Sequence, residues 1–345
     1  MKLINKKNWK LLLTIATSLA LVGLIIAARH QIFDTISNLG RVNAWALPLM
    51  LVWQGLEYHA YANMYKELFQ ILGERIRYKP LLRVALELNF VNNVFPSGGV
   101  SGVSYFALRM RDAEVPASKS TVVQLTKFIL IFVSFQILMG LGLIMLAFGG
   151  HVNNFTILIA GSLFTLLLVA TIGVGIIVSS RRRINAFFTF VANFLNKVIH
   201  IFRPKSPETI NIERGRKIFD DLHDNYLELR QNYLALRQPL LNALLCNICE
   251  VLTIYTVYVA FGHWVNPGAI IIAYAVASVS GLISVLPGGV GIYEATMTAV
   301  LAAAGIKAGI SIPVTVMYRI LNMLIQLPIG YYFYNRRLHE KRAVV

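Results

Sequence analysis

Long apolar segments separated by short basic ones make up most of this chain of 345 residues. Segments of this length are typical of helices that cross a bilayer, which need about 20 predominantly apolar residues. We expect eight of them, with six spanning a membrane as single helices and two, 81–108 and 268–303, entering it as re-entrant broken helices. The apolar segments are 11–28, 44–64, 81–108, 121–148, 155–178, 240–261, 268–303 and 311–334.

The two exceptional segments are interrupted by nearly the same sequence. Pro96-Ser97-Gly98-Gly99 in the first recurs as Pro287-Gly288-Gly289 in the second. Proline removes a backbone donor and glycine destabilises a helix, so each helix should break there. Broken helices occur at membrane depth where the backbone is buried in protein or lines a cavity. Two such breaks at matching places in two halves of a chain indicate a transport site.

Composition agrees with a membrane protein. Apolar residues make up 57% of the chain and charged residues 14%, with a mean hydropathy of +0.63, whereas soluble domains carry about 25% charged residues. The formal net charge of +16 therefore indicates basic loops beside anionic headgroups, and we expect no nucleic-acid partner.

The basic residues also set the expected orientation. With the N-terminus in the cytoplasm, and each interrupted segment entering and leaving on one side, nearly all basic clusters fall inside. Only Arg29, Arg41 and Lys307 then lie outside. We therefore expect a multi-pass protein of the cytoplasmic membrane with both termini in the cytoplasm.

This orientation makes the two halves run in opposite directions, as in an inverted-topology repeat. Glu57 and Glu250, Pro96 and Pro287, and Lys127 and Arg319 recur at an almost constant separation. The expected fold is an all-α polytopic membrane domain over 1–345. Its expected parts are a first repeat at 1–148, a second repeat at 149–345 and, within the second, a cytoplasmic helical insertion at 179–239.

The insertion contains two further helical patterns. Residues 184–202 form an amphipathic pattern typical of a helix on the membrane surface. Residues 213–237 carry a short heptad-type seam, which fits either a homodimer or partner helix, or a helix docked on its own membrane domain.

Charged residues inside the apolar segments are the candidate site. A charge at the bilayer centre costs about 2.5–3.5 kcal/mol on insertion scales, so charges that persist there usually have a role. The structural alternative is a set of ion pairs, such as Glu294 with Arg319. The charged residues in question are Glu57, Glu87, Lys127, Glu250, Glu294 and Arg319.

The functional alternative is a polar cavity between the repeats. Helix N-termini after Pro96 and Pro287 would offer backbone N–H groups to an anion such as phosphate. Lys127 and Arg319 would add positive charge, and Glu57 and Glu250 would hold a cationic headgroup or carry protons. The expected substrate-binding residues are Pro96, Gly98, Gly99, Lys127, Pro287, Gly288, Gly289, Glu294 and Arg319.

Enzyme and cofactor motifs are missing from the sequence. It has no phosphate-binding P-loop, G-x-S-x-G elbow, H-E-x-x-H motif or acidic metal cluster. Cys246 and Cys249 form a C-x-x-C pair, but no second pair completes a zinc site. We expect them to pack a helix, and we expect no metal or cofactor.

The stretches 92–99 and 286–294, followed by Tyr318-Arg319, resemble the lysylphosphatidylglycerol synthase transmembrane family, the flippase-like membrane domain of the multiple peptide resistance factor. Many members carry an acidic–basic pair where this chain has Thr126-Lys127, and the soluble aminoacyl-transferase domain is absent from these 345 residues. The resemblance implies movement of an anionic, aminoacylated or glycosylated lipid from the inner to the outer leaflet, with membrane phospholipid as the expected partner. Two alternatives remain open: a phosphatidylglycerol lysyltransferase or other lipid-modifying transferase (or its membrane subunit), and a scaffold acting through 213–237.

Overall fold

The computed structural model describes residues 26, 29–30, 33–38, 40, 42–95, 100–148, 154–187, 189–190, 223–283 and 289–343, and their regular structure is entirely helical. The first elements are η1 (Ala44–Ala46), α2 (Leu49–Ile71), α3 (Tyr78–Val94), α4 (Val100–Arg111), α5 (Ala117–Phe148) and α6 (Asn154–Val178). After the insertion follow η2 (Tyr233–Leu236), α9 (Arg237–Ala260), α10 (Pro267–Ile283), α11 (Ile292–Ala303) and α12 (Ala308–Ala343). The expectation of an all-α fold is confirmed for these residues.

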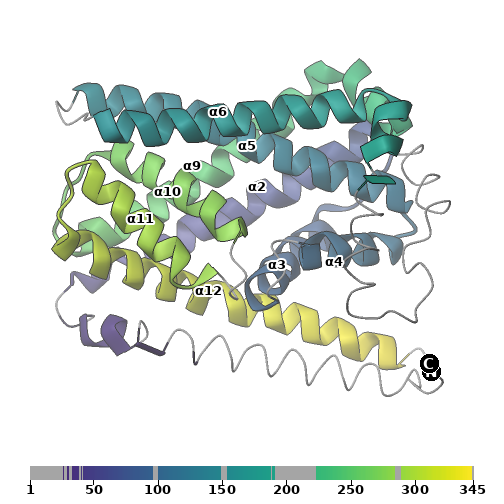
Figure 1. Ribbon diagram of the computed structural model, residues 1–345. Helices are drawn as coiled ribbons and strands as arrows, with labels where there is room; N and C mark the ends of the chain where they lie inside the picture. The colour runs from purple at the N-terminus through teal and green to yellow at the C-terminus, as the bar shows by residue number, and fades with distance from the viewer. Residues whose placement is uncertain are drawn as a thin grey trace, which may run out of the picture.

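The long helices run side by side, with α6 and α12 on opposite faces in Figure 1 and α2, α5 and α9 between them. Four helical stretches are long and apolar enough to cross a membrane: Ala117–Phe148, Thr156–Ile177, Tyr233–Ala260 and Ala308–Arg337. They coincide with four of the expected spans and support a multi-pass membrane location. The expected span 44–64 is represented by α2, a helix of mixed polarity, and 11–28 lies outside the described residues.

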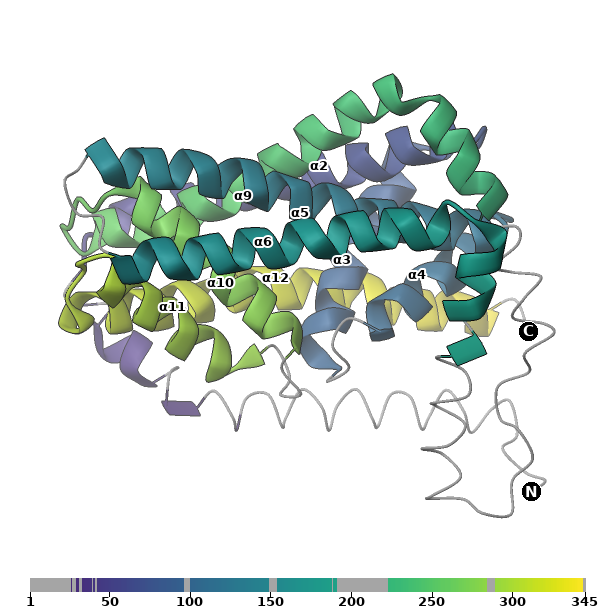
Figure 2. The ribbon, with the colours of Figure 1, turned by 45° about the horizontal axis from the view of Figure 1, so that its top comes forward.

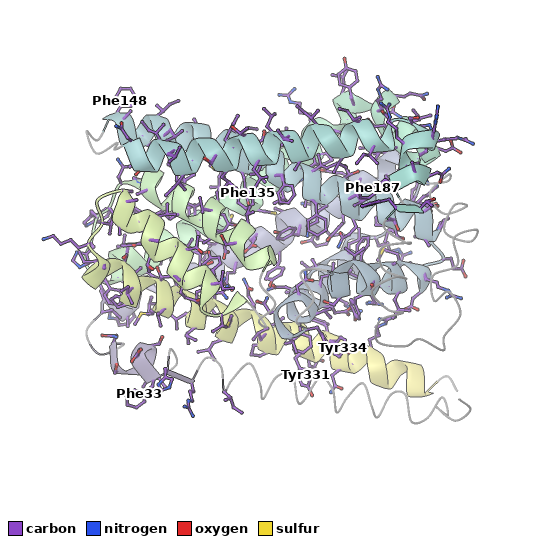
Figure 3. All side chains as sticks on the ribbon, in the orientation of Figure 1. Phe33, Phe135, Phe148, Phe187, Tyr331 and Tyr334 are labelled. Carbon is purple, nitrogen blue, oxygen red and sulfur yellow. The ribbon has the colours of Figure 1, made fainter. Side chains whose placement is uncertain are left out.

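An apolar surface covers the outside of α5 and α6. Only 17% of the most apolar 18-residue stretch of α6 is buried inside the protein, whereas 67% of the corresponding stretch in Tyr233–Ala260 is buried. Exposed side chains on this surface include Leu158 and Val169 of α6 and Phe148, which projects at the end of α5 (Figure 3). A helix that is apolar yet exposed suits a hydrocarbon solvent, so α6 is positioned to face lipid and α9 forms the centre.

Both expected helix interruptions are present. Helix α3 ends at Val94, the backbone is extended at Phe95 (φ −95°, ψ 116°), and α4 begins at Val100. In the second half, α10 ends at Ile283 and α11 begins at Ile292. Gly291, which precedes α11, has a φ of 89°, a conformation that glycine adopts without steric cost. The intervening residues 96–99 and 284–288 lie outside the described part.

The order of the helices recurs. Each half of the chain contains one interrupted pair of helices, α3 with α4 or α10 with α11. Each pair is preceded by a long helix, α2 or α9, and followed by another, α5 or α12. In both views, α10 and α11 lie in the left half of the molecule and α3 and α4 in the right half (Figures 1 and 2). The two interrupted segments thus occupy opposite ends of the long helices.

Contacts between the halves follow the same pattern. Helices α2 and α9 pack along each other, α5 packs on α10, and α12 packs on α3. Glycine permits close approach where α10 packs on α5 and where α12 packs on α3. A Cβ on Gly268 would lie 2.3 Å from the carbonyl oxygen of Gly142, and a Cβ on Gly330 would lie 2.7 Å from the carbonyl oxygen of Leu86. Helix crossings at this distance leave no room for a side chain.

The described part of the insertion lies against the membrane domain. Residues 223–231 are helical, and Leu229, Tyr226 and Leu236 join the core cluster formed by α2, α3, α5 and α9. These side chains therefore support the alternative in which this helix docks on its own membrane domain. Residues 191–222, with much of the expected surface helix and the start of the seam, lie outside the described residues, and a dimer or partner for 213–237 stays a prediction.

Candidate functional site

Glu57 and Glu250 meet at the contact between α2 and α9, where their carboxyl groups lie next to each other. The sequence predicts matching positions for these two residues in two repeats. Their contact lies where the first and second halves of the chain face one another. The sequence predicted both residues as site residues but did not predict their contact.

The two carboxyl groups differ in their hydrogen bonds. Glu250 is only 7% exposed, and its Oε1 accepts from the Tyr318 hydroxyl and, at 2.9 Å, from Nδ2 of Asn322. Oε2 of Glu250 and Oε2 of Glu57 are buried and have no hydrogen-bond partner among the described residues. Each carboxyl therefore retains an unused acceptor atom, an arrangement that is costly in a buried site.

A chain of amide side chains continues from this pair. Asn322 accepts from Gln54 of α2 and, at 2.8 Å, from Gln326, one turn along α12. Asn89 of α3 donates to Gln326 and to the Tyr58 hydroxyl. Sequence reasoning missed these amides, although Gln and Asn within the apolar segments 81–108 and 311–334 were the signal that could have revealed them.

A cavity of about 100 Å³ adjoins this network on the first-half side. Its wall comes from α2, α3 and α5 and combines carboxyl, amide, phenol and ammonium groups. The residues that line it are Glu57, Tyr58, Tyr61, Tyr65, Ala85, Leu88, Asn89, Asn92 and Lys127.

Lys127 supplies the positive charge of this cavity. Its Nζ lies 5.0 Å from the ring centroids of Tyr61 and Phe128 and 5.9 Å from that of Tyr65. Cation–π contacts of this kind stabilise an ammonium group that is removed from water. No carboxylate of the described residues lies within ion-pair distance of Nζ, although Glu57 lines the same cavity.

Arg319, the matching residue of the second half, is held in place. Its Nε lies 3.2 Å from Oε1 of Glu294, and its guanidinium lies 4.4 Å from the ring centroid of Tyr293. The other oxygen of Glu294 accepts the backbone N–H of Gly291 at 2.6 Å, at the start of α11. The structure thus forms the ion pair that was the structural alternative for these two residues. A role for either in substrate binding stays a prediction.

The remaining predicted residues divide between described and undescribed parts. Gly289 is buried with a φ of 68°, and a Cβ there would lie 3.3 Å from the Cα of Gly281. This packs the end of the second break against α10. The other predicted motif residues, namely Pro96, Gly98, Gly99, Pro287 and Gly288, lie outside the described residues.

Glu87 and the two cysteines have structural partners. Arg109 of α4 contacts Glu87 through two hydrogen bonds, from Nε at 2.6 Å and Nη2 at 3.2 Å. This pair ties α3 to α4, away from the Glu57–Glu250 contact. Cys246 and Cys249 are buried free thiols in α9, and the Cys246 thiol lies 3.6 Å from the Glu57 carbonyl oxygen.

Two comparisons with known proteins agree with this architecture. The family model of the lysylphosphatidylglycerol synthase TM region matches residues 10–330. A UPF0104 membrane protein of Methanothermobacter thermautotrophicus is 30% identical over 91 residues, which cover 26% of this chain and 27% of that protein. The chain thus aligns with about a quarter of that relative's length. Because the family model covers nearly all of the sequence, this chain belongs to the family of the lysylphosphatidylglycerol synthase transmembrane region, whose name connects it with lipid handling in a membrane.

Proposed function

We propose that this protein is a flippase-like transporter that moves an anionic, aminoacylated or glycosylated lipid between the two leaflets of the cytoplasmic membrane. The observation that carries this function is the ammonium group of Lys127, which faces a polar cavity without a carboxylate partner among the described residues. Moving a lipid requires a polar path for its headgroup through an apolar protein. The cavity and its adjoining amide chain provide part of such a path.

The chemistry of the cavity favours a phosphodiester. Lysine binds phosphate as a point charge, and Lys127 has no carboxylate of the described residues within ion-pair distance, so an incoming phosphate could contact its ammonium directly. The cavity, at about 100 Å³, is smaller than the roughly 150 Å³ of an apolar cavity that binds benzene. It therefore suits the phosphate portion of a headgroup, while the acyl chains stay in the lipid beside the apolar helices.

The difference between the halves supports alternating access. Lys127 lines a cavity and has no carboxylate partner among the described residues, whereas Arg319 is paired with Glu294 and stacked on Tyr293. If the halves are inverted repeats, exchange of these two arrangements would transfer the open site from one side of the membrane to the other. The recurring order of the helices, and the placement of the two interrupted segments at opposite ends, support that inversion.

A leaflet-resolved assay tests this function. Purified protein is placed in phosphatidylcholine vesicles containing phosphatidylglycerol or lysylphosphatidylglycerol with a fluorescent acyl chain, and inner-leaflet label is followed with an impermeant quencher. We expect faster translocation than in protein-free vesicles for at least one of the two lipids. Rates no higher than in protein-free vesicles for both lipids would contradict the proposal. Mass spectrometry of the extracted lipids serves as a second readout, because a newly modified lipid would identify a transferase instead.

A further inference from the structure

The contact between Glu57 and Glu250 points to a role that neither residue could have alone. We propose that these two carboxyl groups share one proton, and that the pair takes up and releases a further proton as lipid binds and leaves. The shared proton follows from the structure of the resting site. The coupling to lipid rests on the proposed function.

The two adjacent carboxyl groups, each with a buried Oε2 that has no hydrogen-bond partner among the described residues, favour a proton between them. An ionised carboxylate can only accept, so two ionised groups would repel each other and leave both buried Oε2 atoms without a donor. A proton on one carboxyl makes it a donor to the other. Two carboxyl groups that share a site in this way titrate as a unit.

The charges around the pair also favour one proton shared between the two carboxyl groups. Lys127 of α5 is the charged group that faces the pair, whereas Arg319 of α12 is engaged by Glu294 of α11. One shared proton leaves the pair with a single negative charge, which balances the ammonium of Lys127. The other titratable groups around the pair are the phenols and thiols of Tyr58, Tyr61, Cys246, Cys249, Tyr274, Tyr293 and Tyr318.

An anionic headgroup at Lys127 changes this balance. It adds one negative charge beside Glu57, and in a low-dielectric site a second proton on the pair restores neutrality. Lipid binding then favours proton binding and, by linkage, proton binding favours lipid binding to the same extent. The structure therefore assigns one proton to each anionic headgroup, both moving in the same direction.

Infrared spectroscopy tests the shared proton without any transport. Wild-type protein at neutral pH should show the C=O stretch of a buried carboxylic acid. Glu57→Gln and Glu250→Gln should each abolish this band. Each variant retains one of the two carboxyl groups, and we expect that group to ionise: Glu57 beside Lys127, or Glu250 beside Tyr318 and Asn322. The control is Glu67→Gln on α2, whose carboxyl accepts from Asn242 at 2.9 Å and should leave the band unchanged.

Two infrared results would overturn the shared proton: no such band in the wild type, or loss of the band in only one of the two variants. The latter would show a proton that belongs to one residue by itself.

A pH gradient across the lipid vesicles tests the coupling. Acidifying the side from which fluorescent phosphatidylglycerol departs should accelerate wild-type translocation, by up to about tenfold per pH unit while proton binding limits the rate. Both Gln variants should lose this response and the Glu67→Gln control should keep it. Wild-type transport that ignores pH, or that responds to a sodium gradient instead, would overturn the coupling and leave the proposed function intact. If no lipid moves but the infrared result holds, the shared proton stands and the coupling and proposed function both fail.

Discussion

Lipid translocation should fall about ten- to a hundredfold when Lys127 is replaced by alanine. A hydrogen bond to a charged group contributes about 1.5–3 kcal/mol, and each 1.4 kcal/mol corresponds to a factor of ten. Loss of the ammonium would remove the counter-charge of the phosphate from a cavity that offers no other cation among its lining residues. The measurement is the initial rate of fluorescent phosphatidylglycerol translocation in vesicles.

Two variants make this result specific. Lys127→Arg keeps the positive charge and should retain most of the rate. Lys79→Ala removes an exposed lysine at the start of α3 and should leave the rate unchanged, which controls for the loss of attraction between basic loops and anionic lipid. If the Lys127→Ala protein translocates lipid as fast as the wild type, Lys127 is not required, and this result would contradict the proposed function.

Replacing Glu294 by glutamine should destabilise the protein by about 3 kcal/mol. Both members of the Glu294–Arg319 pair are largely buried, with side chains 9% and 12% exposed. Removing one partner of such a pair leaves a buried charge with less compensation, at a cost of about 3–5 kcal/mol. The free energy of unfolding in detergent micelles measures this effect.

The double variant Glu294→Gln with Arg319→Gln separates charge from packing. It removes both charges and should recover much of the lost stability. Glu74→Gln is the matched control, because the Glu74–Lys119 pair is 28% and 25% exposed and pairs on the surface contribute about 0–1 kcal/mol. A Glu294→Gln protein as stable as the Glu74→Gln protein would show that the buried pair contributes little.

The sequence was informative wherever a rule acts locally. Apolar length predicted α5, α6, α9 and α12, since a span needs a fixed number of residues. Proline and glycine predicted the end of α3 and the interruption between α10 and α11, because both residue types destabilise helix interiors. The regular separation of Lys127 and Arg319 along the sequence also led us to expect one basic side chain inside each half of the chain.

Other features depend on packing between distant segments. Whether Lys127 and Arg319 have partners is decided by neighbouring helices: Glu294 lies near Arg319 in the structure, and no equivalent acid of the described residues reaches Lys127. The contact of Glu57 with Glu250 required knowing that α2 packs along α9. The amides Asn89, Asn322 and Gln326 have no individual signature and acquire meaning only as one hydrogen-bonded chain.

The proposed alternating access requires that the two halves of the chain run in opposite directions across the membrane. Single cysteines at Ala113, after α4, and Ala302, near the end of α11, test this directly, since both positions are exposed and the native Cys246 and Cys249 are buried. With an impermeant maleimide, Ala302→Cys should label on intact cells and Ala113→Cys only after the membrane is opened. Labelling of both from the same side would contradict the inverted arrangement.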